Sequence, residues 1–287
     1  MSNSTGGRAE ATWLPLFARI AAEVQAAAAD VWGTPGSREV QGQGAGGDGT
    51  VYIDALAEGI VLRLLEEEHA SGRNFTLISE EVGERTYGSG GDVVVVDPID
   101  GSYNAKMGIP YFSIALAAAR GRDFGSVYEA TVRNLVTGEH YEARRGRGAT
   151  RNGAALHSGG GLLDGRLNVV QIEATKWHQH AWRYAQLLQE AQKIRMLGSA
   201  ALNICLCATG ALSLSVAPTL RSVDCVGPIL VLEEAGGAAS DLDGGPVSRA
   251  SLDLSTRQPV LAAAGPEALQ VGLSLLQHDQ AGVVPGA

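Results

Sequence analysis

Two aspartates three residues apart, Asp97 and Asp100, follow directly after four consecutive valines. Pro98 restricts the backbone between them, and Gly101 permits a turn that other residues resist. Two carboxylates held so close repel each other unless a cation lies between them. The spacing therefore predicts a cation site at the end of a buried strand. A surface Asp-Pro turn with Asp100 as a helix cap is the alternative that this motif leaves open.

Three more acidic residues occupy comparable positions along the chain. Glu80 lies in the sequence Ser-Glu-Glu after a predicted strand, and Asp54 and Asp224 lie at the starts of predicted helices. Each is a candidate oxygen ligand for a hard cation such as Mg²⁺. Each is equally compatible with a helix cap or with a favourable acid in a first helical turn.

The periodicity of apolar residues predicts alternating helices and strands. In the first half we expect helices at 12–31 and 54–69, a glycine-rich loop at 41–50, and strands at 75–78, 93–96, 111–120, 124–133 and 139–144. In the second half we expect strands at 168–172, 193–197, 211–216 and 259–263, and helices at 177–192, 199–208, 225–236 and 266–277. This α/β alternation indicates layered sheets covered by helices.

A polar, glycine-rich stretch at 158–166 is a candidate junction between two halves of the chain. Residues 1–157 form an N-terminal α+β half with most of the candidate ligands. Residues 158–287 form a C-terminal α/β half, which would supply the last metal ligand and the substrate pocket.

Composition restricts the class of protein. The chain has 287 residues, of which 45% are hydrophobic and 18% charged, enough apolar material for a substantial core. A net charge of −9 argues against nucleic-acid partners and against an anionic membrane surface. The chain has three cysteines, and this odd number argues against a disulfide framework. The first ten residues are polar and do not resemble a secretory signal. We therefore expect a cytoplasmic protein without membrane spans.

Together the acidic motifs carry a resemblance to a known family. Their order is Asp54 after a glycine-rich loop, Ser-Glu-Glu at 79–81, Asp-Pro-Ile-Asp-Gly-Ser at 97–102, and Asp224 ahead of Glu-Ala-Gly-Gly at 234–237. This order resembles the inositol monophosphatase family of Mg²⁺-dependent, lithium-sensitive phosphatases. The archaeal type, which acts on inositol phosphate and on fructose 1,6-bisphosphate, is the most similar. The resemblance extends over about residues 12–277.

The resemblance implies a fold and a set of metal ligands. The family fold is a layered αβαβα sandwich, commonly found as a homodimer. Glu80, Asp97 and the carbonyl of Ile99 would hold a first Mg²⁺, and Asp97, Asp100 and Asp224 a second. Glu80 would also assist a third ion, so that two or three Mg²⁺ are expected in each active site.

The resemblance also implies which residues act on the attacking water and which contact the substrate. Asp54 and the Ser102 hydroxyl would orient and activate the water, and the backbone amides of Gly101 and Ser102 would bind phosphate. The side chains expected to contact the small phosphorylated substrate are Asn104, Met107, His178, Ser199 and Arg221.

The departures from the family pattern are expected to affect substrate binding and not metal binding. Ser102 replaces a threonine, and Val223 replaces an aromatic residue. Ala217 stands where the animal-type enzymes have a glutamate that binds inositol hydroxyls, and Met107 stands where the archaeal type has an arginine. The sugar pocket is therefore expected to be rebuilt around an intact metal site.

The sequence thus predicts an Mg²⁺-dependent phosphatase that hydrolyses a small phosphomonoester of inositol, a sugar or a related polyol by means of metal-activated water. The alternatives within this class are a fructose-1,6-bisphosphatase or a nucleoside-phosphate phosphatase, including one in specialised metabolism. A non-hydrolytic ligand-binding protein on the same fold is the alternative from another class.

Overall fold

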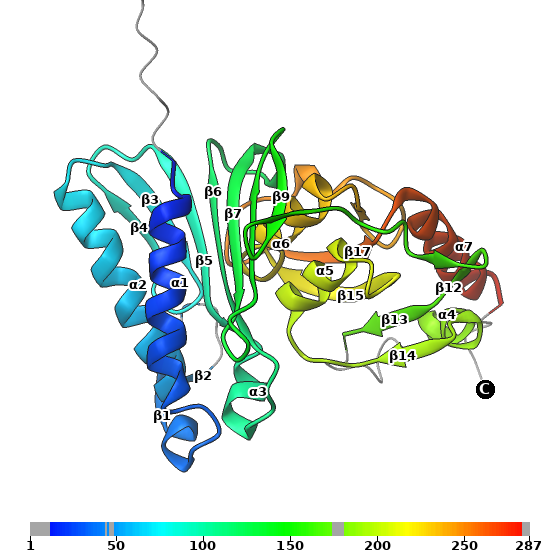
Figure 1. The fold of residues 1–287 in the computed structure, drawn as a ribbon, viewed down its shortest axis with the longest axis horizontal. Coiled ribbons are helices and arrows are strands. Elements are labelled where there is room, and N and C mark those ends of the chain that lie inside the picture. The colour runs from blue at the N-terminus through cyan, green and yellow to red at the C-terminus, as the bar shows by residue number, and fades with distance from the viewer. Residues whose placement is uncertain (1–11, 44, 46–48, 174–180, 283–287) are drawn as a thin grey trace, which may run out of the picture.

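The computed structural model describes residues 12–43, 45, 49–173 and 181–282, and shows five layers in the order αβαβα (Figure 1). The expected fold class is therefore confirmed. Its first sheet has eight strands, in the spatial order β10 (Ala154–Leu156), β9 (Gly148–Arg151), β8 (His140–Arg144), β7 (Val127–Asn134), β6 (Ser113–Ala119), β5 (Asp92–Asp100), β3 (Phe75–Ser79) and β4 (Gly83–Tyr87).

The valines of β5 explain why helices cover both faces of this sheet. Successive side chains of a strand point to opposite faces. Val94 and Val96 pack in a cluster with α1 (Leu14–Ala29) and α2 (Tyr52–Ala70), which form the first layer. Val93 and Val95 pack in a second cluster with α5 (Ala200–Ala208) and α6 (Ser222–Glu234), which form the middle layer.

The second sheet has five strands, in the order β14 (Lys193–Arg195), β13 (Val169–Ile172), β15 (Leu214–Arg221), β17 (Arg257–Ala263) and β16 (Ala238–Ser240). One face packs on α5 and α6, and the other packs on α4 (Ala185–Glu190) and α7 (Pro266–Gly282). Smaller elements are α3 (Ser102–Met107), the strand pairs β1 (Val40–Gln43) with β2 (Gly49–Val51) and β11 (Leu162–Leu163) with β12 (Arg166–Leu167), and 3-10 turns at Pro35–Arg38, Phe124–Ser126, Ala181–Tyr184 and Val247–Arg249.

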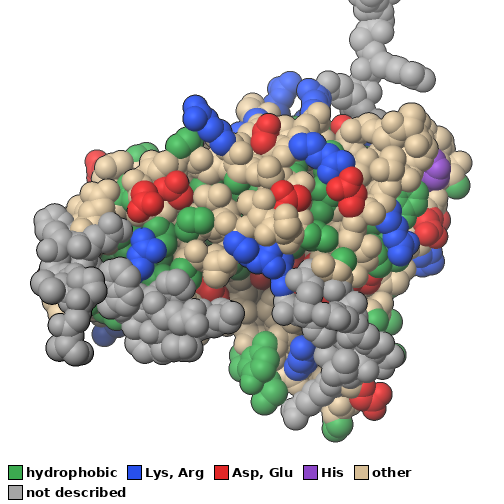
Figure 2. Space-filling model, turned by 180° about the vertical axis from the view of Figure 1, so that it is seen from behind, with side chains coloured by type: hydrophobic (Ala, Val, Ile, Leu, Met, Phe, Trp, Pro, Cys, Tyr) green, Lys and Arg blue, Asp and Glu red, His purple; other side chains and the backbone are tan. Residues whose placement is uncertain are grey.

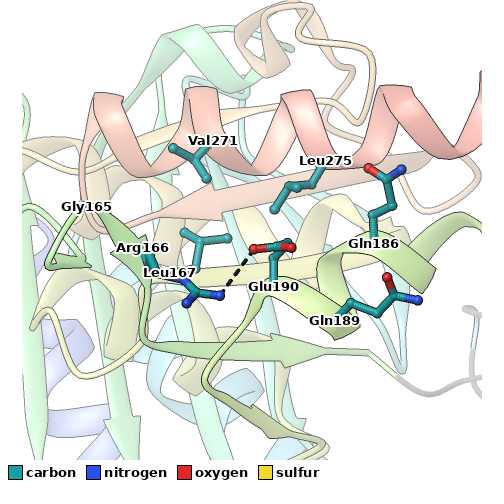
Figure 3. Close-up of a pocket in the computed structure, with 8 residues that line it drawn as sticks. All are labelled: Gly165, Arg166, Leu167, Gln186, Gln189, Glu190, Val271 and Leu275. Carbon is teal, nitrogen blue, oxygen red and sulfur yellow. Dashed lines mark hydrogen bonds and ion pairs between the residues drawn. The ribbon is translucent and has the colours of Figure 1, made fainter.

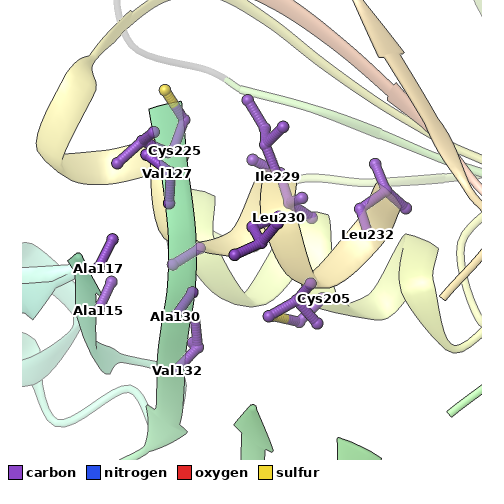
Figure 4. Packing of buried hydrophobic residues seen from close by; sticks show 14 of the residues in the cluster. Ala115, Ala117, Val127, Ala130, Val132, Cys205, Cys225, Ile229, Leu230 and Leu232 are labelled. Carbon is purple, nitrogen blue, oxygen red and sulfur yellow. The ribbon is translucent and has the colours of Figure 1, made fainter. Parts of the chain in front are cut away.

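The middle of the molecule is a core shared by both sheets (Figure 4). Small residues of the first sheet, Ala117 and Ala130, face α6, and Cys205 and Cys225 are buried among aliphatic side chains there. A Cβ added at Gly227 of α6 would lie 3.2 Å from the carbonyl oxygen of Leu116. The helix therefore approaches the sheet more closely than most residues with a side chain allow.

The first sheet uses residues 75–156, and the second uses residues 169–263. The division into functional halves at 157/158 stays a prediction, because residues from both halves form the core between the two sheets.

Several expected boundaries were wrong. The strand expected at 93–96 runs from Asp92 to Asp100, and the helix expected at 225–236 begins at Ser222, so that Asp224 lies inside its first turn. The strand expected at 211–216 is Leu214–Arg221. The loop expected at 41–50 contributes to two short paired strands. Of the helix expected at 177–192, the structure shows a 3-10 turn and the six residues of α4, and residues 174–180 lie outside the described part.

Candidate metal centre

Two neighbouring strands of the first sheet end at the same edge. β3 and β5 are parallel, with Ser79 opposite Val96, so Glu80 and Asp97 leave the sheet side by side. β5 and β6 pair irregularly between Asp97 and Asp100, which is where Pro98 interrupts the ladder. Asp97 and Asp100 therefore lie within the distorted end of β5. The sequence had predicted both residues beyond the end of this strand.

Asp224 reaches this edge from the middle layer. It occupies the first turn of α6, where its carboxylate accepts a hydrogen bond of 3.0 Å from the backbone N–H of Arg221. Carboxylate oxygens of Glu80, Asp97 and Asp224 all lie within 4.8 Å of one another. The helix-cap interpretation and the ligand interpretation of Asp224 are therefore compatible.

The chemistry of this oxygen set fits a hard divalent cation. Asp97 is only 2% exposed. Burial raises its pKa well above the ordinary value, and the charges of Asp100, Asp224 and Asp54 raise it further. A cation bound among these oxygens would remove that repulsion and favour the ionised form. The acidic cluster can therefore hold a metal ion.

An ion pair also lies within the cluster. The guanidinium of Arg221 pairs with the Oε1 atom of Glu80, and both side chains are largely buried. Arg221 was expected to contact substrate, whereas in this structure it balances the charge of a candidate ligand.

Asp100 makes a different set of contacts. Its carboxylate accepts hydrogen bonds from the Ser113 hydroxyl (2.9 Å) and from the backbone N–H groups of Ala200 (3.0 Å) and Ala201 (3.1 Å), and from the Ser199 hydroxyl. Asp100 therefore caps the start of α5, where a negative charge is favourable. Burial raises its pKa to about 7, and the hydroxyl donors act in the opposite direction. Asp100 is not part of the three-residue oxygen cluster.

The motif after Asp100 turns sharply into α3. Gly101 has a φ of 85°, and a Cβ there would lie 2.9 Å from the carbonyl oxygen of Gly198. Glycine is therefore required both for the backbone conformation and for the close approach. Ser102 begins α3, and its backbone amide is at the helix N-terminus. The Ile99 backbone is buried, and its N–H donates to Asp97.

Asp54 lies in the first turn of α2 and is 4% exposed. It is close enough to Asp97 to raise the pKa of that carboxyl. One helical turn later, Glu58 is equally buried and accepts a hydrogen bond of 2.7 Å from the Ser79 hydroxyl. Glu58 was missed in the sequence, although four-residue spacing from Asp54 places both on one helix face.

The residues expected to contact substrate differ in their exposure and in their partners. Asn104 is 7% exposed, and its amide nitrogen donates to the carbonyl oxygens of Tyr111 (2.8 Å) and Leu197 (2.7 Å), which joins two loops. Met107 is 46% exposed on α3. Ser199 is fully buried against Asp100. His178 lies outside the described residues.

A pocket of about 350 Å³ lies elsewhere, between β12, α4 and α7 (Figure 3). It combines apolar Leu167, Val271 and Leu275 with a 3.2 Å ion pair between Arg166 and Glu190. These elements carry none of the candidate ligands, so this pocket is separate from the metal centre.

The layered fold and the acidic cluster define a metal-dependent phosphomonoester hydrolase. The sequence matches the inositol monophosphatase family over residues 12–280, and the chain belongs to that family. It is 32% identical to a fructose-1,6-bisphosphatase/inositol-1-monophosphatase of Methanothermobacter thermautotrophicus, over 88% of this chain and 91% of the relative. A protein of the same name from Thermococcus kodakarensis is 30% identical over 94% of this chain and 99% of the relative.

A solved structure of an inositol monophosphatase–fructose 1,6-bisphosphatase has a TM-score of 0.80 and 26% identity, and covers 92% of this chain and 100% of that one. The resemblance expected from the order of the acidic motifs is thereby confirmed.

Proposed function

We propose that this chain is an Mg²⁺-dependent phosphatase that hydrolyses a small phosphomonoester of inositol, a sugar or a related polyol. The observation that carries the proposal is the convergence of Glu80, Asp97 and Asp224 within 4.8 Å, from segments far apart in the sequence. Oxygen-only ligand sets of this kind suit Mg²⁺, which is commonly held by a few carboxylates together with substrate phosphate.

In this proposal Glu80, Asp97 and Asp224 hold the metal, and Asp100 and the Ile99 carbonyl complete sites for two or three ions. Bound Mg²⁺ would neutralise charge on the phosphoryl group and lower the pKa of a bound water. The network around Asp100 fixes that carboxylate, because hydrogen bonds from Ser113 and the start of α5 restrain both of its oxygens.

Other residues orient the reactants. The buried carboxylate of Asp54 accepts a hydrogen bond from the attacking water and takes up its proton, and the Ser102 hydroxyl aligns that water. The amides of Gly101 and Ser102 donate to the phosphate oxygens. The positive φ of Gly101 supports this role, because it turns the chain so that these consecutive amides lie at the start of α3.

The substrate class is supported by the relatives. The relatives from Methanothermobacter thermautotrophicus and Thermococcus kodakarensis are both named fructose-1,6-bisphosphatase/inositol-1-monophosphatase. Fructose 1,6-bisphosphate is therefore one alternative substrate, and nucleoside phosphates are a second alternative that the sequence leaves open. Ala217, which stands where the animal enzymes have a glutamate, favours a substrate pocket different from theirs.

Phosphate release tests the proposal directly. Purified protein is assayed with Mg²⁺ on myo-inositol 1-phosphate, fructose 1,6-bisphosphate, glucose 1-phosphate and a nucleoside 5′-phosphate, with a chelator in parallel. We expect turnover of at least one ester, which excess chelator abolishes and added Mg²⁺ restores. Ligand binding without turnover of any ester would support the non-hydrolytic alternative instead.

We further propose a homodimer. Tyr103, Met107 and Ile109 are 69%, 46% and 45% exposed in and just after α3. Hydrophobic side chains project at the lower edge of the rear face, where α3 lies, whereas charged side chains of both signs are mixed over the rest (Figure 2). Sedimentation velocity tests this: we expect a dimer, and a monomer for Ile109→Glu. A wild-type monomer would contradict it.

Among the described residues, none of the helices is both long and apolar enough to cross a membrane.

Cys205, Cys207 and Cys225 are free and buried. Reduced, buried cysteines are usual in a reducing compartment, which supports our proposal of a cytoplasmic location.

A further inference from the structure

A buried carboxyl group on α2 takes no part in the chemistry proposed above. Glu58 is 4% exposed, and its Oε2 atom accepts a hydrogen bond of 2.7 Å from the Ser79 hydroxyl. Its Oε1 atom has no hydrogen-bond partner within the described part of the chain. A buried carboxyl with one unsatisfied oxygen is unfavourable, and two apolar residues of the same shape would be at least as stable as this polar pair.

The partner of Glu58 is the last residue of β3. Ser79 is fully buried and lies opposite Val96 of β5. Leu77, two residues earlier, packs in the cluster with α1 and α2, and side chains two residues apart on a strand point to the same face. The Ser79 side chain is therefore directed toward α2, and its hydrogen bond to Glu58 joins the end of β3 to that helix.

The next residue, Glu80, is directed to the opposite face of the sheet. Ile78 packs in the middle-layer cluster, and the same alternation places Glu80 toward the middle layer, from which Asp224 approaches it. The backbone N–H of Glu80 donates to the Val96 carbonyl over 3.4 Å, which is longer than an ordinary backbone hydrogen bond. Because backbone pairing is weak here, the side-chain anchor at Ser79 contributes to the position of Glu80.

We propose that Glu58 is a positioning residue for the metal centre, which acts through Ser79 to hold Glu80 in place as a ligand. Neither Glu58 nor Ser79 belongs to the three-residue oxygen cluster. Their effect is therefore on the geometry of Glu80 and not on the charge of the ligand set. This inference rests on the proposed phosphatase function, because that proposal assigns Glu80 to Mg²⁺.

The test measures Mg²⁺ binding to the metal-free protein by isothermal titration, without substrate. Glu58→Met removes the acceptor of the hydrogen bond, and Ser79→Ala removes the donor. We expect the Kd for Mg²⁺ to rise about tenfold in each variant, as is typical when a group that orients a metal ligand is lost. The double variant should bind no more weakly than either single variant, because the two residues act through one hydrogen bond.

Two further variants separate the hydrogen bond from other effects. Glu58→Gln keeps a side-chain oxygen that can accept from Ser79, so its Kd should stay within about twofold of the wild-type value. Glu66→Met makes the same substitution as Glu58→Met at an exposed position of α2, and should bind Mg²⁺ like wild type.

Urea denaturation in a chelator distinguishes positioning from a purely structural role. The double variant replaces both members of a buried polar pair by apolar groups, so we expect it to be at least as stable as wild type although it binds Mg²⁺ more weakly. It also gives the comparison if either single variant fails to fold, because it leaves neither member of the pair without its partner. A structural pair would instead lower stability and affinity together.

Several results would overturn the inference while the proposed function stands. One is an unchanged Kd in the double variant, and another is a double variant that is unstable or unfolded. A third is a Glu58→Gln variant that binds as weakly as Glu58→Met, because charge and not the hydrogen bond would then matter. If wild type itself binds no Mg²⁺, the proposed function loses its metal site, and this inference fails with it.

Discussion

Arg221 and Glu80 form an ion pair across 141 positions of sequence, at the place where the acidic cluster is open to a cation. The arginine directly precedes the helix that carries Asp224, and the glutamate directly follows β3. In the metal-free protein this pair partly offsets the charge of the converging carboxylates. A cation that takes Glu80 as a ligand must weaken or replace the pair.

We therefore expect Arg221→Gln to bind Mg²⁺ more tightly than wild type. Loss of a competing charged hydrogen bond of about 1.4 kcal/mol would lower the Kd about tenfold. Isothermal titration of the metal-free proteins measures this without substrate. Arg122→Gln, which breaks an exposed pair with Glu84, is the control and should bind like wild type. Weaker Mg²⁺ binding by Arg221→Gln would show that the arginine supports the metal site.

Asp97→Asn should abolish turnover and weaken Mg²⁺ binding while the chain stays folded. Asparagine preserves the shape of the side chain but removes a charge that Asp100 and Asp224 repel. The metal-free variant should consequently be at least as stable as wild type at neutral pH, as measured by urea denaturation in a chelator. Asp164→Asn changes an exposed residue and serves as the control. An active variant with normal metal binding would refute the ligand assignment.

Glu58 should make the metal-free protein less stable as pH rises. Burial raises its pKa from 4.5 to about 7 in the folded state, and its Oε1 atom has no hydrogen-bond partner among the described residues. Between these values the folded state retains a proton that the unfolded state has lost, so stability falls as pH rises through that window. The full effect is on the order of 3 kcal/mol.

Glu58→Gln cannot ionise and should show a flatter dependence of unfolding free energy on pH between 5 and 8. Denaturation in chelator at several pH values checks this. Glu190→Gln, an exposed substitution on α4, should retain the wild-type slope. The same slope in Glu58→Gln as in wild type would mean that other carboxyls account for it.

Ser199→Ala should destabilise the protein by about 1–2 kcal/mol, because the buried Asp100 carboxylate loses a hydroxyl donor. The loss also raises the pKa of Asp100, since that hydrogen bond favours the charged form. Thermal unfolding of the metal-free protein at several pH values measures both the loss of stability and the change in the pKa of Asp100. Ser126→Ala, whose hydroxyl bonds only a backbone carbonyl near the surface, is the comparison. Equal stability of Ser199→Ala and wild type would show that the Ser199 hydroxyl does not stabilise the buried Asp100 carboxylate.

The five-layer fold could be predicted because its signals are local. The valines preceding Asp97 are apolar at every position, as a strand covered on both faces must be. Helix periodicity located α1, α2 and α5 to within a few residues. The short strands β4, β9 and β10 escaped notice because they are partly exposed and lack a continuous apolar pattern.

Pairings between distant residues could not be predicted in the same way. The motifs indicated that Glu80, Asp97 and Asp224 carry charge, but not that Arg221 would face Glu80 or that Ser113 and the start of α5 would surround Asp100. These contacts depend on how three layers meet at one sheet edge.

The absence of a side chain at Gly227 has a consequence for chemistry in a different layer of the molecule. The backbone of α6 lies against the carbonyl of Leu116, and Asp224 is carried three residues earlier on the same rigid helix. An added methyl group at Gly227 would require the helix or the strand to shift by a few tenths of an ångström, which would change the position of Asp224 relative to Glu80 and Asp97. The position of Asp224 relative to a bound cation therefore depends on Gly227, which lets the helix pack closely on the strand.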